Sequence, residues 1–358
     1  MGVDHTLPIA AAEAVRPLGE LGRLALEQAR LRTRALAKHP DGDQLWWTPE
    51  ALEQSTPRPV AVHHAARFAG CPAVWDLGCS VGGDLLPLSS VAPTVGVDRD
   101  LARLLLARAN TGAPVVCADV ATLSPTGAVF ADPARRSGGR SGSRRGFDPS
   151  TWSPSLATVL SWPATALGVK VAPGIDYSSL PDDIDVEIVS LGGDVKEAML
   201  WRGTVRDGHR RTATLLGVLP GGVSLRAADA PVPPVRRPGA FLLEPDGAVI
   251  RAHLVAELAG LVGGWLLDPT IAYLSGDVAV PTPFGTWYAV LDVVPFSLKG
   301  VRERLRALDV GPVVIKKRGT AVLPEEFRKQ LKLTGSRELT VVLTRQAGRQ
   351  IALIVKPV

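Results

Sequence analysis

The sequence predicts an α/β protein in which a mainly parallel β-sheet is covered by helices and followed by a smaller α+β domain. Seven short runs rich in Val, Ile and Leu lie between residues 73 and 219, and most are separated by turn or helix-compatible segments. Apolar strands that alternate with crossover segments are typical of parallel sheets buried on both faces. At 358 residues the chain exceeds one compact core, so we expect more than one domain.

The elements follow in order along the chain. Apolar residues at helical spacing predict a helix over residues 10–37 and another over VAVHHAARFAG. The predicted strands are AVWDLG, TVGVD, PVVCAD, AVFADP, LGVKVAP, VEIVSL and TATLLGVL. A Pro-, Gly- and Arg-rich stretch at 220–238 predicts a linker. Beyond residue 285 the order is β-α-β-α-β-β, with the last two strands paired around Ala347-Gly348.

Composition and charge restrict the function classes. No apolar run reaches the roughly 20 residues of a membrane span, and the N-terminus lacks the pattern of a secretion signal. The three cysteines form no CxxC pair and no cluster has metal-ligand spacing, which predicts a cytoplasmic protein without a metal centre. Residues 296–358 hold 14 Lys/Arg and 5 Asp/Glu, or +9, so the rest of the +5 chain carries −4. This asymmetry fits a polyanion-binding surface or a solvated basic face.

A turn of small residues follows the first predicted strand in VWDLGCSVGGD, residues 74–84. Small residues let the backbone approach a ligand closely. Such a unit can hold a dinucleotide, but the turn reads D-x-G-C-S-x-G-G, whereas the dinucleotide pattern is G-x-G-x-x-G. The pattern favours S-adenosylmethionine instead, with a serine in place of the common second glycine. The candidate cofactor residues of this turn are Asp76, Gly78, Ser80, Gly82 and Gly83.

Two further predicted strands end in an acidic residue. Asp98 within GVDRD is placed to accept hydrogen bonds from both ribose hydroxyls, and Asp119 within CAD to accept one from an adenine amino group. Each alone is more often a turn or helix cap, but three acidic strand ends in order predict a nucleoside site. The residues that follow them, Arg99 and Val120, belong to the predicted site.

The fourth predicted strand ends in AVFADPARR, residues 128–136. Ligands of such sheets lie outside the carboxyl ends of the strands, so Asp132 and Pro133 are expected to face the methyl group. D-P-x-x resembles the D/N-P-P-Y/F signature of amino methyltransferases of nucleic acids, in which the first two residues orient the target amine. Arg135 stands here in place of the aromatic residue and can stack on a base or hold a phosphate. Methylation at pyrimidine carbon 5 is disfavoured because all three cysteines precede Asp132.

Basic residues surround this predicted catalytic strand end. The segment SGGRSGSRRGFD predicts a mobile loop that holds phosphates, or else an ordinary solvent-exposed loop. Lys170, which ends the fifth strand, either contacts substrate or extends its charge to solvent. A structural role is expected for Glu197, and a helix-surface position for His63 and His64. The candidate substrate-binding residues of the loop are Arg136, Arg140, Arg144 and Arg145, and those expected to close over the cofactor are Gln54, Ser55 and Thr56.

Several segments together resemble a known family. DLGCSVGGD, GVDRD, FADPARR, SLGGDVKEAMLW, EPDGAVIRA, IAYLSGD and the closing KKRG…LPEEFRKQLKL…LTR resemble bacterial class I S-adenosylmethionine-dependent methyltransferases with a C-terminal THUMP-like domain. The resemblance extends from about Leu52 to the end of the chain. It implies a Rossmann-like seven-stranded sheet, S-adenosylmethionine as the methyl donor and, because THUMP domains bind RNA, a tRNA or rRNA substrate. The RNA contacts would include Lys316, Lys317 and Arg318.

The expected organisation has four parts. They are an N-terminal helical segment (1–60), the cofactor-binding domain (61–222), a small ferredoxin-like insert (240–280) and the THUMP-like domain (284–358). The implied activity is methylation of an RNA base. Two alternatives stay open: a methyltransferase of small molecules or proteins, and an RNA-binding protein that binds the cofactor without catalysis.

Overall fold

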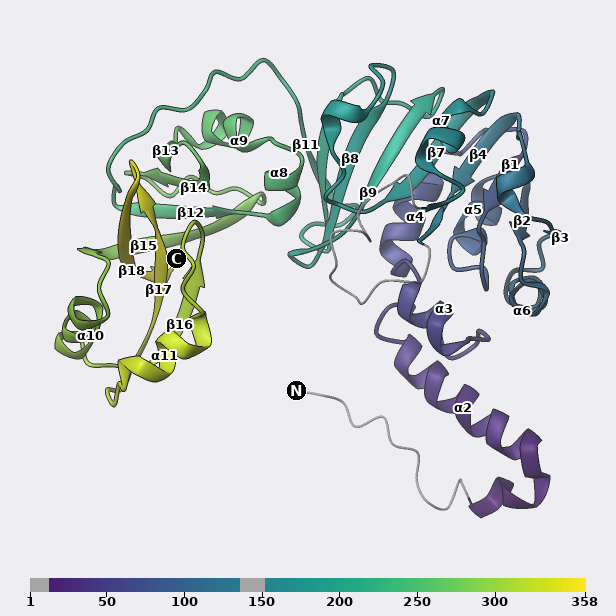
Figure 1. Ribbon diagram of the computed structural model, residues 1–358, viewed down its shortest axis with the longest axis horizontal. Helices are drawn as coiled ribbons and strands as arrows, with labels where there is room; N and C mark the ends of the chain where they lie inside the picture. The colour runs from purple at the N-terminus through teal and green to yellow at the C-terminus, as the bar shows by residue number, and fades with distance from the viewer. Residues whose placement is uncertain (1–12, 136–151) are drawn as a thin grey trace. The chain divides into compact units, whose positions relative to one another are not determined.

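The computed structural model describes residues 13–135 and 152–358 (Figure 1). Its first sheet has nine strands in the order β11-β10-β8-β9-β7-β4-β1-β2-β3. Five neighbouring strands are parallel, in the order β7, β4, β1, β2 and β3. The strand β9 is antiparallel to β7. The bounds are β1 Val74–Leu77, β2 Thr94–Asp98, β3 Val115–Cys117, β4 Gly127–Ala131, β7 Ala164–Val171, β8 Asp185–Leu191, β9 Asp194–Gly203, β10 Arg211–Leu216 and β11 Val223–Arg226.

The predicted seven-stranded, Rossmann-like sheet is present within these nine strands, with one strand reassigned. The prediction missed β9 and took TATLLGVL, which is β10, as the seventh strand. The missed segment DVKEAMLWRG is rich in Lys, Glu, Ala, Met and Leu, residues that favour helices, and its burial in the sheet overrides that preference. The two-residue Gly192-Gly193 turn, with both φ angles positive, precedes β9.

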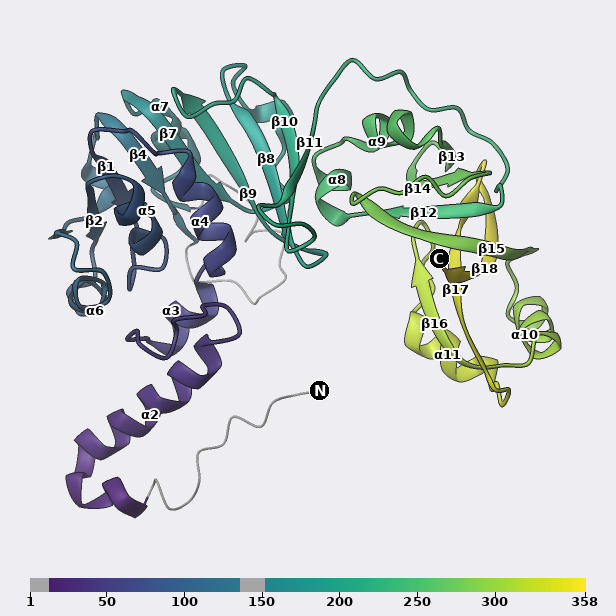
Figure 2. The ribbon, with the colours of Figure 1, turned by 180° about the vertical axis from the view of Figure 1, so that it is seen from behind.

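Helices cover both faces of this sheet (Figures 1 and 2). The helices α4 (Arg58–Ala66), α5 (Leu85–Val91) and α6 (Leu101–Thr111) lie side by side on one face. From β1 the strands β2 and β3 are added at one edge of the sheet, whereas β4 and β7 are added on the other side of β1. Because the crossovers between parallel strands are right-handed, this reversal of direction places α7 (Leu156–Ser161) on the opposite face. The remaining elements of this part are η1 Arg16–Leu18, α2 Gly19–Ala35, α3 Pro49–Gln54, η2 Val120–Thr122, β5 Ala134–Arg135, β6 Trp152–Ser153 and η5 Tyr177–Ser179.

A second sheet has seven strands in the order β13-β14-β12-β15-β18-β17-β16. The strand β12 pairs with β15, so the predicted segments 240–280 and 284–358 contribute to one sheet. The β-α-β-α-β-β order and the closing β17–β18 pair agree with the prediction. The bounds are β12 Phe241–Pro245, α8 Gly247–Arg251, α9 Val255–Val262, β13 Trp265–Asp268, β14 Ile271–Gly276, β15 Gly285–Pro295, α10 Leu298–Ala307, β16 Val310–Lys317, α11 Pro324–Leu331, β17 Arg337–Gln346 and β18 Arg349–Pro357.

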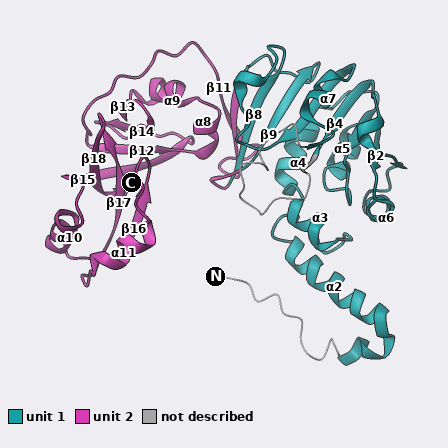
Figure 3. Ribbon diagram, viewed as in Figure 1, with its two compact units in different colours: residues 1–191, 196–210 teal, residues 192–195, 211–358 magenta. Residues whose placement is uncertain are grey.

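The chain divides into two compact units (Figure 3). Residues 1–191 with 196–210 form the first, and residues 192–195 with 211–358 form the second. The second sheet is buried on both faces, because Val341 and Leu343 of β17 pack with α10 and α11, whereas Val342 packs in the opposite cluster with Tyr273. No described helix is long and apolar enough to cross a membrane.

The core of the first unit packs three aromatic rings against a glycine. Phe68, Phe130 and Trp201 are fully buried, with ring centroids 6.1 to 6.2 Å apart for the pairs that include Phe68. A methyl group on Gly168 of β7 would lie 2.5 Å from the Trp201 ring and 3.1 Å from that of Phe68. The glycine therefore makes room for the rings.

We predict that Gly168→Ala lowers the free energy of unfolding by about 1–3 kcal/mol, because the added methyl overpacks this cluster. Gly260→Ala is the matched control, since Gly260 lies in α9 with open space around it. Alanine should leave stability there unchanged or raise it by up to about 1 kcal/mol. Thermal unfolding of both variants measures the difference, and equal melting temperatures would contradict the packing argument.

Candidate active site

The register of the first sheet brings the predicted site residues to one edge. Leu77 of β1 is paired with Val97 of β2 and with Ala131 of β4, and Ala131 is paired with Val169 of β7. The next residue along the chain from each of these therefore lies at the same level, at or just beyond the carboxyl end of its strand. These four residues are Gly78, Asp98, Asp132 and Lys170.

Two neighbouring cavities lie where these strands end. The larger has a volume of about 390 Å³, and Gly78, Asp98 and Asp132 line both. The smaller extends to the ends of β2 and β3. Five of the other predicted cofactor residues are divided between them: Ser80 and Gly83 line the larger, and Arg99, Asp119 and Val120 line the smaller.

The turn after β1 has the geometry that its small residues predict. Gly78 has φ +92°, and a Cβ there would lie 2.7 Å from the carbonyl oxygen of Asp132, so a side chain is excluded. Ser80 also has a positive φ, of 49°, and its backbone N–H donates to Asp98 Oδ2 at 3.0 Å. Gly82 has a different role from the predicted one, because it packs closely against Thr111 and Ala107 of α6 and lines neither cavity.

The three acidic strand ends are placed differently from one another. Asp98 Oδ1 accepts a hydrogen bond from the N–H of Asp100 at 2.9 Å, so both its carboxylate oxygens are fixed by backbone N–H groups. Asp119 caps η2 through the N–H of Ala121 at 2.9 Å and also lines the smaller cavity. The expected cap role of Asp119 and its predicted place in the cofactor site are thus compatible.

Asp76 lies within the sheet, only 1% exposed, and lines neither cavity. Its carboxylate oxygens have no hydrogen-bond partner among the described residues. Burial, followed by the charges of Asp84 and Asp132, raises the pKa of Asp76 well above its usual range. A turn of small residues at Gly78, next to the fixed acceptors of Asp98 and to Asp119, fits a cofactor with amino and hydroxyl groups. The residues present thus fit S-adenosylmethionine.

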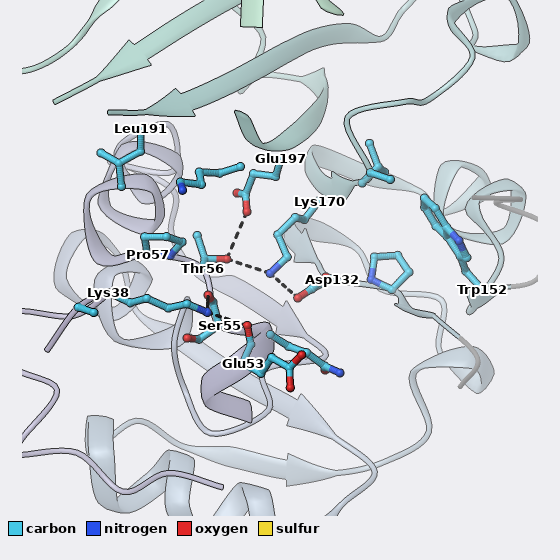
Figure 4. Close-up of a pocket in the computed structure, with 16 residues that line it drawn as sticks. Lys38, Glu53, Ser55, Thr56, Pro57, Asp132, Trp152, Lys170, Leu191 and Glu197 are labelled. Carbon is cyan, nitrogen blue, oxygen red and sulfur yellow. Dashed lines mark hydrogen bonds and ion pairs between the residues drawn. The ribbon is translucent and has the colours of Figure 1, made fainter. Parts of the chain in front are cut away.

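A further cavity, of about 360 Å³, adjoins the cofactor cavity (Figure 4). The residues that line both are Gln54, Ser55, Asp132, Pro133 and Lys170. The segment before α4 thus borders the cofactor cavity through Gln54 and Ser55. Thr56 lines the further cavity but not the cofactor cavity. Any group bound in this further cavity would lie beside both Asp132 and the cofactor residues.

A buried ion-pair cluster occupies the boundary between the cavities. The Lys170 ammonium, only 12% exposed, contacts Asp132 Oδ2 and lies 3.4 Å from Asp84 Oδ2. It also donates a hydrogen bond to Thr56 Oγ1 at 2.9 Å. Burial alone would lower the pKa of Lys170, but the carboxylates of Asp132, Asp84 and Glu197 raise it above its ordinary value. Lys170 is therefore a charged member of the site and not a lysine that extends to solvent.

Two buried titratable groups flank this cluster. Glu197 lies 3.5 Å from Thr56 Oγ1 through Oε2 and 3.1 Å from His64 Nδ1 through Oε1. Burial raises the pKa of Glu197 to about 8 and lowers the pKa of His64 to about 3, so both groups are uncharged near neutral pH. The expectation of a helix-surface position was wrong for His64, which is buried. His63 Nε2 lies 2.7 Å from Glu187 Oε1, the oxygen that accepts in this hydrogen bond.

Two residues of the site were not predicted from the sequence. Asp84 lies at the end of the small-residue turn, and its carboxylate is 3.4 Å from the Lys170 ammonium. Trp152 lines the further cavity from β6, which pairs with β5 directly after Asp132-Pro133. No local pattern indicates this pairing, because the two strands are separated by more than a dozen residues of Gly-, Ser- and Arg-rich sequence.

The predicted basic residues fall into three groups. Arg136, Arg140, Arg144 and Arg145 lie outside the described residues, and Arg135 belongs to β5. In the second unit, Lys316 contacts Glu244 at 2.5 Å, and Arg318 lies 3.6 Å from the same carboxylate. Of the three predicted RNA contacts there, Lys317 is exposed. Within residues 13–135 and 152–358, no group of three or more His, Cys, Asp or Glu side chains is placed to hold a metal.

Known proteins are similar to this chain in sequence and in fold. Two proteins of Mycobacterium tuberculosis strains, both described as uncharacterized S-adenosylmethionine-dependent methyltransferases, are 39% identical over 345 residues, covering 91% of this chain and 94% of theirs. The crystal structure of a putative methyltransferase from Porphyromonas gingivalis has the same fold, with a TM-score of 0.77, 20% identity and 97% coverage of each chain. Residues 285–357 match the family described as THUMP domain-like. The chain therefore belongs to the S-adenosylmethionine-dependent methyltransferases and is an enzyme of this family with a THUMP-like C-terminal region.

Proposed function

We propose that this methyltransferase modifies a base nitrogen in tRNA or rRNA. The observation that carries the proposal is that Asp132 and Pro133 line both the cofactor cavity and the cavity beside it. A nucleophile in the second cavity thus meets Asp132 next to the methyl donor. The THUMP-like match at 285–357 and the +9 charge of residues 296–358 support a polyanionic substrate.

The residues of the site contribute mainly position and charge. Bound S-adenosylmethionine supplies a methyl group that its positively charged sulfur has already activated. The Asp132 carboxylate accepts a hydrogen bond from the target amine and directs the nitrogen lone pair at the methyl carbon, with the Pro133 carbonyl as a second acceptor. An amine that received the methyl group would become positively charged, and Asp132 would take up the proton that it releases.

Lys170 makes this role of Asp132 possible. The carboxylates of Asp84 and Asp132 both raise the pKa of Asp76 and of Glu197, because neighbouring negative charges disfavour ionisation. The Lys170 ammonium in contact with Asp132 opposes this effect and favours the ionised carboxylate. We therefore assign Lys170 as a positioning residue that holds Asp132 in its accepting form.

The proposed RNA contacts change in emphasis. Lys316 and Arg318 share the single carboxylate of Glu244, which offsets one of their two charges, so of the three residues we assign phosphate contact first to Lys317, which is exposed. The arginines of segment 135–145 remain proposed phosphate contacts. Since each neutralised phosphate releases counterions, RNA binding should weaken as salt rises.

Transfer of labelled methyl from S-adenosylmethionine to total RNA tests the proposed function. The RNA comes from a strain that lacks the gene, so the target position is unmodified. Label in tRNA or rRNA, followed by digestion to nucleosides, identifies the modified base. An absence of label with cofactor binding intact by calorimetry would contradict an RNA substrate and favour a small-molecule or protein substrate.

Asp132→Ala should reduce methyl transfer to RNA by at least about 100-fold, because the variant loses both the orienting acceptor and the proton acceptor. S-adenosylmethionine affinity, measured by calorimetry, should stay within a few fold. Asp132→Asn is the matched variant and should retain more activity than alanine, since its amide oxygen still accepts a hydrogen bond. Equal loss of cofactor affinity and turnover in Asp132→Ala would contradict this role.

Glu197→Gln should remove part of the pH dependence of stability. The pKa of Glu197 is about 8 in the folded protein against an ordinary 4.5, so the folded state retains a proton that the unfolded state releases. The retained proton stabilises the folded protein fully below about pH 4.5, and this stabilisation is lost as pH rises to about 8.

The measurement is the melting temperature of both proteins from pH 5 to pH 9. The advantage of wild type over Glu197→Gln should shrink up to about pH 8 and then stay constant. His64 is common to both proteins, so its own titration cancels in the difference. Parallel curves across the range would show that Glu197 ionises in the folded protein at its ordinary pKa.

A further inference from the structure

Trp152 is an aromatic wall of the cavity beside Asp132 (Figure 4). In that view Trp152 and Thr56 lie on opposite sides of the Asp132–Lys170 pair. Among the described residues that line this cavity, no other is aromatic. Trp152 is 3% exposed and lines the cavity, so its indole is held firmly at the cavity wall.

Backbone pairing ties this indole to the catalytic strand end. In the antiparallel pair of β5 and β6, Trp152 is in register with Arg135, and Asp132-Pro133 immediately precede β5. The next residues, Ser153 and Pro154, line the smaller cofactor cavity with Asp98 and Asp119. Trp152 is therefore carried by a short segment that borders the predicted cofactor site on one side and the further cavity on the other.

The two sides of this cavity differ in chemistry. One has the flat, electron-rich indole, and the other has the polar groups of Asp132, Lys170 and Thr56. The indole Nε1 is buried and has no hydrogen-bond partner among the described residues. A planar heteroaromatic ring with an exocyclic amine matches both sides, because its face can stack while its amine meets Asp132. An aliphatic amine or a ribose hydroxyl has no face to stack.

We propose that Trp152 determines substrate specificity by stacking on the ring of the target base, so that the substrate is a base with an exocyclic amino group turned out of its stack. This inference rests on the proposed function and narrows it. Trp152 then takes the role of the aromatic residue that the D-P-A-R sequence lacks. Its backbone is paired with that of Arg135, the residue that stands at the position of this aromatic. A cavity of about 360 Å³ has the size of a small-ligand site, so a base enters it only when extruded.

The test measures nucleotide binding apart from catalysis. Calorimetry follows the binding of adenosine, cytidine, guanosine and uridine 5′-monophosphates to the full chain saturated with S-adenosylhomocysteine. Adenosine or cytidine monophosphate should bind wild type and Trp152→Phe within about threefold of each other, since both retain a ring. Trp152→Leu should bind roughly tenfold or more weakly, the loss expected when base–aromatic stacking is removed.

Trp162→Leu is the matched control, because Trp162 is also 3% exposed but does not line the cavity. It should bind the nucleotides as wild type does. If Trp152→Leu loses affinity for S-adenosylmethionine, Trp152→Met replaces it, since the flexible methionine side chain fills irregular space without offering a ring.

Two results would overturn the inference: nucleotide affinity unchanged in the variant without a ring, or no binding of any of the four nucleotides to wild type. Nucleotide binding that depends on Trp152, with no methyl transfer to RNA, would contradict the RNA substrate and leave the stacking role standing. Methyl transfer to RNA together with a nucleotide affinity that does not depend on Trp152 would support the RNA substrate and contradict the stacking role. The two proposals therefore fail separately.

Discussion

The contact between the Lys170 ammonium and the Asp132 carboxylate is the interaction on which the site depends. The parallel pairing of β4 and β7 creates it, because Ala131 is in register with Val169 and the next two residues emerge side by side. Without the Lys170 ammonium, which contacts both, the neighbouring carboxylates of Asp84 and Asp132 would repel each other with no positive charge between them. The same strand ends supply Gly78 and Asp98, so one sheet edge holds the cofactor residues and the catalytic charge together.

Much of the fold could be predicted from the sequence because its signals are local. The strand and turn at residues 74–84, the Asp98 strand end and the alternation after residue 285 have short periods and small-residue turns that determine local structure. The strand β9 shows where local preference fails. Its Lys, Glu, Ala and Met residues favour a helix, but burial between two other strands decides its conformation.

The candidate site was predictable only where its residues follow strands directly. Asp98, Asp132 and Lys170 were found in this way, although the charge state of Lys170 depends on Asp84, 86 residues away in sequence. Trp152 and the burial of His64 depend on pairings and packing that no short motif indicates. The basic motif that contains Lys316 and Arg318 was predicted to contact RNA, and the sequence does not indicate that Glu244 pairs with both side chains.

In the proposed mechanism, Lys170 keeps Asp132 ionised. The pH dependence of methyl transfer to RNA by wild type and by Lys170→Met tests this role most directly. Loss of the cation should raise the pKa of Asp132, so the acidic limb of the variant's rate profile should move to higher pH, with activity lost near neutral pH and partly recovered above it. Lys170→Arg, which retains the charge, should stay closer to wild type. Profiles of wild type and Lys170→Met that rise at the same pH would contradict the account.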